Sequence, residues 1–129
     1  MIRSQSLPLV FATVVTLCNC LISLSFAMNG LVDSGFLTGD TIEVFAAYSA
    51  SRALAIAAVA LIVAWRQSAN ELFVVSLIAT ITQLLDAVIG GVQHDPGKTV
   101  GPLLIGIVQM AVTVWISRKR LAPKIAVGR

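Results

Sequence analysis

Charge is scarce in this chain of 129 residues. Charged residues make up 12% of the sequence, about half of their usual ~25% share in a soluble globular domain, while hydrophobic residues make up 57%. This composition excludes an ordinary soluble domain and predicts an integral membrane protein. The net charge is only +3, and the sequence holds no folded basic domain that could carry a nucleic-acid site. We therefore expect no nucleic-acid partner.

Metal-binding and redox residues are scarce as well, with two cysteines and one histidine. Cys18 and Cys20 would point about 200° apart on a helix, so we expect two buried thiols and no disulfide between them. Neither the cysteine spacing nor a single histidine fits a zinc site, and there is no haem, iron–sulfur or dinucleotide motif. The run ending Gly97-Lys98-Thr99 imitates a phosphate-binding loop, but Val92 stands where its first glycine belongs. The sequence therefore predicts neither a metal nor a cofactor.

Long apolar runs dominate what is present. Four of them are long enough to cross a bilayer, and polar segments separate them. We predict transmembrane helices near residues 7–28, 43–66, 71–92 and 100–118. The predicted fold class is all-α, an antiparallel bundle of four transmembrane helices that forms a single domain over residues 1–129.

The basic residues predict the orientation of this bundle. With four spans, Lys98 lies on one side of the membrane, and seven bases lie on the other side: Arg3, Arg66, Arg118, Lys119, Arg120, Lys124 and Arg129. Because positive residues favour the cytoplasmic face, we expect both termini in the cytoplasm. The expected location is the bacterial cytoplasmic (inner) membrane, with the lipid bilayer as the first partner.

One arginine interrupts the second apolar run. A cation near the middle of a membrane is costly, so Arg52 should face an acid or a polar cavity. Asp86, in the third run, is the candidate partner. At 1.5 Å per residue, Arg52 lies roughly 13 Å and Asp86 roughly 9 Å below the outer ends of their predicted spans. We therefore predict that the two side chains approach each other inside the bundle.

Amides at a similar depth extend this polar layer to the other two spans. Asn19 of the first span and Gln109 of the fourth lie about 13 Å below their outer ends. On the third span, Gln83 shares one helical face with Asp86. Small residues on the second span form a stripe that predicts a packing seam against a neighbouring helix: Ala46, Ser49, Ala50, Ala53, Ala57, Ala60 and Ala64.

Two interpretations of the polar layer stay open. In the first it is a site, with Arg52 and Asp86 as catalytic residues and further polar residues binding a substrate, namely Asn19, Tyr48, Gln83, Gln109 and, at the outer mouth, His94. In the second, Arg52 and Asp86 form a structural ion pair, the amides set helix register, and His94 is a solvated loop residue. Intramembrane ionisable residues favour the first interpretation.

A family resemblance supports the predicted frame. Tyr48 and Arg52 in the second span, Arg52 being followed by Ala-Leu-Ala, together with Gln83-Leu-Leu-Asp86 in the third and a Gly-Pro start to the fourth, resemble the DoxX-like superfamily of small bacterial membrane proteins. The resemblance covers residues 43–117. Many members have an acid where this chain has Ala53. The resemblance implies a four-helix antiparallel bundle, and it implies little about the chemistry of the protein.

The leading functional hypothesis is a bundle whose cavity binds an amphipathic, lipid-soluble molecule of the isoprenoid, quinone, sterol-like or polyketide kind. If the chain is an enzyme, Arg52 polarises an oxygen and Asp86 transfers a proton, as an isomerase, cyclase or hydrolase requires. The alternative is a non-enzymatic accessory subunit or homo-oligomer in which the polar layer is structural.

Overall fold

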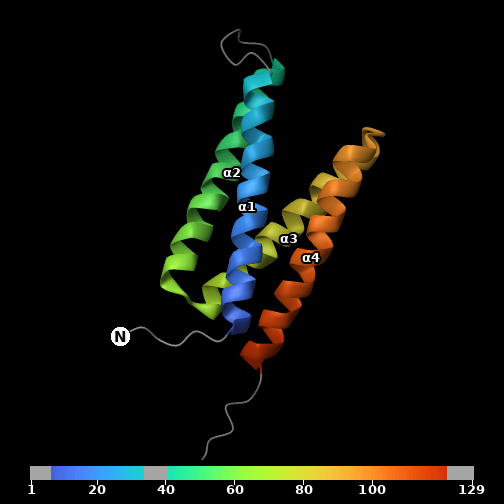
Figure 1. The fold of residues 1–129 in the computed structure, drawn as a ribbon. Coiled ribbons are helices and arrows are strands. Elements are labelled where there is room, and N and C mark those ends of the chain that lie inside the picture. Colours follow the sequence, from blue (N-terminus) through green and yellow to red (C-terminus); the bar gives the residue numbers. More distant parts are fainter. Residues whose placement is uncertain (1–6, 34–40, 122–129) are drawn as a thin grey trace, which may run out of the picture.

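The computed structural model describes residues 7–33 and 41–121, and these fold into four helices (Figure 1). They are α1 (Leu7–Asp33), α2 (Thr41–Arg66), α3 (Ala69–Val92) and α4 (Pro96–Leu121). Each contains a stretch that is long and apolar enough to cross a membrane: residues 7–32, 46–66, 69–92 and 96–118. The predicted all-α, four-span bundle is confirmed, and the chain is a multi-pass membrane protein.

Two of the predicted boundaries were wrong. The first helix continues through Met28 to Asp33, and the fourth begins at Pro96 instead of Val100. Pro102, which we took as part of a helix start, lies inside α4. Of the bases used to predict orientation, Arg3, Lys124 and Arg129 lie outside the described residues, as do the side chains of Lys119 and Arg120.

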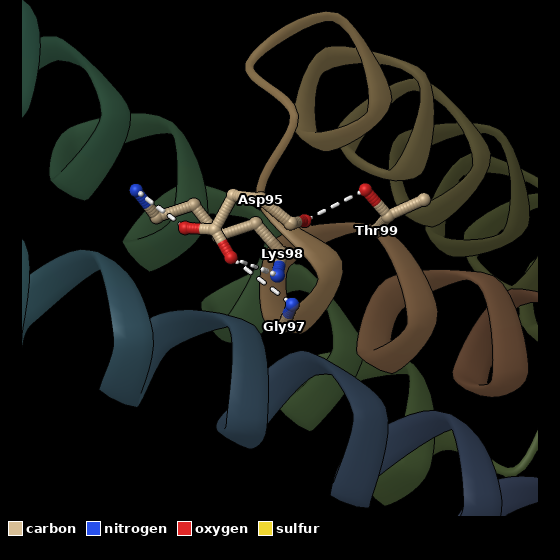
Figure 2. A network of polar contacts seen from close by, with 4 residues as sticks. All are labelled: Asp95, Gly97, Lys98 and Thr99. Carbon is tan, nitrogen blue, oxygen red and sulfur yellow. Dashed lines mark hydrogen bonds and ion pairs between the residues drawn. The ribbon is translucent and has the colours of Figure 1, made fainter.

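Asp95 explains why α4 begins early (Figure 2). Its Oδ1 atom accepts hydrogen bonds from the backbone N–H groups of Gly97 and Lys98 at 3.0 and 3.2 Å, and its Oδ2 atom lies 3.3 Å from Lys98 Nζ. Asp95 thus caps the helix, and Pro96 occupies the first position, where its missing N–H is not needed. These bonds, led by the one from the Lys98 backbone, lower the pKa of the Asp95 carboxyl.

A second tight turn joins α2 to α3. Gln67 has a positive φ of 53°, which reverses the chain after α2, and Ser68 caps α3 by accepting a hydrogen bond from the Glu71 backbone N–H at 3.4 Å. Arg66 Nη2 and Glu71 Oε1 bridge the turn at 3.2 Å. The chain therefore reverses within two residues, so α2 and α3 are close at this end.

Glycines allow α3 and α4 to pack closely. A Cβ atom on Gly90 would overlap the backbone of Lys98 and Thr99, and one on Gly106 would lie 3.3 Å from Gln83 Cβ. Bare backbone at these two positions brings the helices together along the hairpin. Gly91, by contrast, meets only Thr99 Cγ2, at 4.0 Å.

The predicted small-residue seam on α2 packs in part, since three of its alanines are buried while Ser49 is exposed. Ala50, Ala57 and Ala60 are all at least 95% buried, and Ala57 and Ala60 join Ala12 and Cys20 of α1 in the main apolar cluster. Cys20 is buried as predicted, but Cys18 is exposed, so the prediction for Cys18 was wrong. The two positions face opposite sides of α1, and only one side packs against other helices.

The two hairpins, α1–α2 and α3–α4, are not parallel to each other. They meet near the α2–α3 turn and diverge toward the end that carries the α3–α4 turn (Figure 1). Within the described helices, α2 does not contact α4. We term the end of the bundle where the two hairpins meet the closed end. The main apolar cluster lies toward this end, with members such as Val63, Leu72 and Ile116. The opposite half is therefore more open between α2 and α3.

Candidate functional site

A small cavity lies where α2 and α3 separate. Its volume is about 70 Å³, and α1, α2 and α3 supply its walls. The lining residues are Asn19, Cys20, Ser23, Ala27, Ser49, Arg52, Ala53, Ile56, Ala79, Thr82 and Asp86. The structure thus brings Arg52, Asp86 and Asn19 to one place, as predicted.

Arg52 and Asp86 reach this cavity from similar distances along consecutive helices. Arg52 is 14 residues from Arg66, where α2 ends, and Asp86 is 17 residues from Ala69, where α3 begins. At 1.5 Å per residue these spacings are roughly 21 and 26 Å from the α2–α3 turn. Helix direction reverses between α2 and α3, so similar spacing from their shared turn places the two residues at a similar level of the bundle.

The two charges share the cavity without a direct ion pair. Their charges attract each other. In the part of the chain that the structure describes, however, the direct ion pairs are Arg66–Glu71 and Asp95–Lys98. Arg52 is exposed and Asp86 is half-buried. Arg52 and Asp86 therefore line one cavity, and no direct ion pair joins them.

Four polar side chains around the cavity form what we term the open cluster: Ser49, Arg52, Thr82 and Asp86. None of them makes a side-chain hydrogen bond or a direct ion pair with residues 7–33 or 41–121. In a bilayer no bulk water is present to satisfy such groups, so each unpaired group carries a cost. The open cluster is the part of the bundle whose polar side chains lack hydrogen-bond or ion-pair partners among the described residues.

The predicted amides lie beside the cavity and are bonded to one another. Asn19 Nδ2 donates to Gln109 Oε1 at 3.1 Å, and Gln83 Nε2 donates to Asn19 Oδ1 at 2.6 Å. Gln83 Nε2 also lies 2.8 Å from Ser23 Oγ, which accepts from it. All three amides are at least 96% buried. Gln83 and Gln109 do not line the cavity, and their hydrogen bonds tie α1 to α3 and α4.

Hydroxyl groups continue this arrangement toward the closed end. Gln109 Nε2 donates to Thr16 Oγ1 at 3.0 Å and to Ser76 Oγ at 2.6 Å. Thr113 Oγ1 lies 2.7 Å from Ser76 Oγ and 3.1 Å from Thr80 Oγ1. We term the whole set the bonded network: Thr16, Asn19, Ser23, Ser76, Thr80, Gln83, Gln109 and Thr113. No buried side-chain nitrogen or oxygen in the described residues lacks a partner.

Sequence reasoning missed Ser76, Thr80 and Thr82. The signal for the first two was available, because Ser76 and Thr80 extend the polar face of Gln83 by steps of three and four residues. Hydroxyl residues are common in membrane helices, where they bond to their own backbone, as Thr80 does to Ser76 O at 2.8 Å. Thr82 lies four residues before Asp86 on the same helical face, so the same kind of signal was available for it, and both residues line the cavity.

Tyr48 lies outside the cavity. It is 70% exposed and lines a shallow, open outer groove on α2 together with Ser49, Ser51, Arg52 and Ala55. Ser51 Oγ donates to Tyr48 O at 2.9 Å, so this hydroxyl is used within its own helix. Arg52 and Ser49 line both the groove and the cavity, so these two residues form the lip between them.

His94 also lies away from the cavity. It is exposed in the α3–α4 turn with a positive φ of 55°, and its Nδ1 atom lies 3.0 Å from Val92 O. Its backbone N–H donates to Gly91 O at 3.1 Å, in the pattern of a helix C-terminus. The structure does not bring His94 to Arg52 or Asp86.

The open cluster has defined chemical capabilities. The guanidinium of Arg52 can only donate hydrogen bonds, a carboxylate at Asp86 accepts them, and the hydroxyls of Ser49 and Thr82 do both. A bound oxygen can thus be polarised by Arg52 while Asp86 exchanges a proton with it. Within the described helices no three His, Cys, Asp or Glu side chains come together as a metal-ligand set.

Comparison with protein-family models, with curated protein sequences and with solved structures found no match to this chain.

Proposed function

We propose that this membrane protein binds the polar group of an amphipathic, lipid-soluble molecule in the cavity between α2 and α3. The observation that carries the proposal is the open cluster. Every buried polar side-chain atom among the described residues is bonded, while Ser49, Arg52, Thr82 and Asp86 converge on one cavity without partners. A ligand that supplies those partners removes the cost of leaving them unpaired in the membrane.

The size of the cavity decides how such a molecule lies. Pockets that enclose a drug-sized ligand measure about 300–1,000 Å³, several times the 70 Å³ found here. Only a polar group can therefore enter. The apolar body lies outside, along the groove on α2 that Tyr48 and Ser51 line and that Arg52 joins to the cavity.

Within this proposal the predicted residues take different roles. Arg52 and Asp86 contact the polar group directly, and Asn19 forms part of the cavity wall. Gln83 and Gln109 hold Asn19 in place, and Tyr48 contacts the body of the ligand from the groove. If the molecule is converted, Asp86 is the residue that transfers the proton. His94 has no role in the site.

The proposed location is the bacterial cytoplasmic membrane, with both termini in the cytoplasm. The excess of basic residues on the membrane face that carries the two termini supports this orientation. The resemblance to the DoxX-like superfamily supports the four-helix frame.

Mass analysis of co-purifying molecules tests the binding proposal. The protein is purified in mild detergent, and small molecules are extracted from wild type, Arg52→Gln and Asp86→Asn. We expect one class of lipophilic molecule to be enriched in wild type and reduced about tenfold in each variant, because each loses a charged partner of the ligand.

Two matched controls lie on the same helices. Arg66→Gln and Glu71→Gln remove the same charges from α2 and α3 at the opposite end, where the two residues pair with each other. Both controls should retain the enriched molecule. If wild type carries no enriched molecule, or if all four variants lose it equally, the binding proposal is wrong.

The competing candidate is an accessory subunit or homo-oligomer, and the small cavity volume is the observation that favours it. In that case a polar side chain from another membrane helix satisfies the open cluster. Cross-linking from Ala55→Cys, on the exposed side of α2, would then yield a defined dimer or a complex with one partner protein. The ligand proposal expects no such product.

A further inference from the structure

The charges around the cavity restrict what kind of polar group fits it. Arg52 and Asp86 line the same cavity, and in their ionised forms they contribute one positive and one negative charge. The pair is therefore neutral overall. Both side chains line the cavity, and no direct ion pair joins them in the described part of the chain. A guest between them meets a donor on one side and an acceptor on the other.

A charged guest fits this arrangement poorly. An anion would pair with Arg52 and leave Asp86 without its counter-charge, and a cation would pair with Asp86 and leave Arg52 alone. Either outcome leaves a net charge within the membrane-spanning part of the bundle, where ions are costly. An uncharged group that accepts from Arg52 and donates to Asp86 keeps the site neutral and satisfies both residues.

The cavity volume limits the size of that group. At about 70 Å³ the cavity is several times smaller than a pocket that encloses a drug-sized ligand, so only a small group enters it. A carboxamide, an undissociated carboxyl or a hydroxyketone is such a group.

We propose that the ligand's polar group is uncharged and presents a carbonyl oxygen beside an O–H or N–H donor, the carbonyl facing Arg52 and the donor facing Asp86. This inference rests on the proposed binding function and names the class of molecule that binds. Ser49, on the same lip as Arg52, and Thr82, on the wall with Asp86, supply further hydrogen bonds to such a group.

Four probes with the same ten-carbon length separate the alternatives: decanamide, methyl decanoate, decanoate and decylamine. Thermal unfolding of the purified protein is measured in detergent at equal mole fractions of each probe. We expect decanamide to raise the melting temperature of wild type most. Methyl decanoate has the carbonyl without the donor and should bind about tenfold more weakly.

Charge variants sharpen the test. Asp86→Asn leaves a net positive site, so the preferred probe should change from decanamide to decanoate. Arg52→Gln leaves a net negative site and should change the preference to decylamine. Arg66→Gln and Glu71→Gln alter the protein's net charge equally but lie at the far end of α2 and α3, so both should keep the wild-type order.

Failure of this inference is distinguishable from failure of the binding proposal. If decanoate or decylamine stabilises wild type most, and the effect disappears in Arg52→Gln or Asp86→Asn, the site binds a charged group, so the inference is wrong while the binding proposal stands. If no probe distinguishes wild type from these two variants, the inference is wrong. The binding proposal then depends on the co-purification result alone.

Discussion

The bonded network and the open cluster lie side by side in one bundle, yet they differ in how their polar groups are satisfied. In the network, Gln109 is fully buried and uses its amide to join α1, α3 and α4. In the cluster, Arg52 and Asp86 share a cavity without hydrogen bonds or a direct ion pair in the described part of the chain. The network explains how the helices hold together. The side chains of the cluster have no hydrogen-bond or ion-pair partner among the described helices, so a partner must come from another molecule.

Helix packing accounts for the difference between the two regions. Gly90 and Gly106 let α3 and α4 approach closely, so side chains between them reach one another. No comparable contact joins the outer halves of α2 and α3, which diverge from their shared turn (Figure 1). Serine and threonine side chains thus end up bonded to other side chains in the network and unpaired in the cluster.

The largest effect is expected from adding a side chain at Gly90, where α3 and α4 pack closely. Gly90→Ala should destabilise the protein by about 3 kcal/mol, because its Cβ atom would overlap the Lys98 backbone, which cannot move without shifting α4. Gly91→Ala is the matched control and should be neutral or more stable by up to about 1 kcal/mol. Equilibrium unfolding in mixed detergent measures both. Equal effects at the two positions would show that close α3–α4 packing does not hold the network together.

The next largest effect is expected inside the network. Gln109→Leu should cost about 2 kcal/mol, because Asn19 Nδ2 loses its acceptor in a buried site. Val108→Leu is the control, since Val108 is 54% exposed on the same helix. The same unfolding measurement compares them. A Gln109→Leu protein as stable as wild type would mean that the network's hydrogen bonds contribute little.

Variants of the open cluster should behave differently from those of the network. Asp86→Asn and Arg52→Gln should each destabilise ligand-free protein by only about 1 kcal/mol, because each removes the longer-range attraction between two charges that make no direct bond in the described structure. Breaking a buried ion pair would instead cost about 3–5 kcal/mol. Unfolding of delipidated samples distinguishes the two cases. A loss in the larger range would favour the structural interpretation of Arg52 and Asp86.

The smallest expected effect lies outside both regions, at Asp95. Its pKa in the folded protein is lowered from the ordinary 3.8 by hydrogen bonds from the backbone of Lys98 and Gly97. The stability from this cap is therefore present above pH 3.8 and is lost as the pH falls through the folded pKa. Asp95→Asn still caps α4 and should flatten that acid-dependent loss, measured as melting temperature against pH. An unchanged acid profile would assign the loss to other groups.

The sequence predicted the fold well because membrane spans are encoded in long apolar runs. It also identified the centre of the network, since Asn19, Gln83 and Gln109 occur at matching depths on three helices. The start of α4 was wrong because a capping aspartate at position 95 outweighed the Gly-Pro signal at Gly101 and Pro102.

Side-chain direction was harder to predict than depth. Tyr48 shares a helical face with Arg52, yet only Arg52 also lines the cavity, while Tyr48 is 70% exposed and lies in the outer groove. His94 lies at the right end of the molecule, but the α3–α4 turn holds it away from the cavity. The space between Arg52 and Asp86 depends on how far α2 and α3 diverge, which no local pattern encodes.

The most direct test of the contrast between the two regions is an experimental structure in lipid nanodiscs at a resolution that shows bound small molecules. We predict density from a non-protein molecule between Arg52 and Asp86, extending toward Tyr48, and none among Asn19, Gln83 and Gln109. A structure in which Arg52 and Asp86 bond directly and the cavity is closed would contradict the account, as would one in which a side chain from another protein helix fills the cavity.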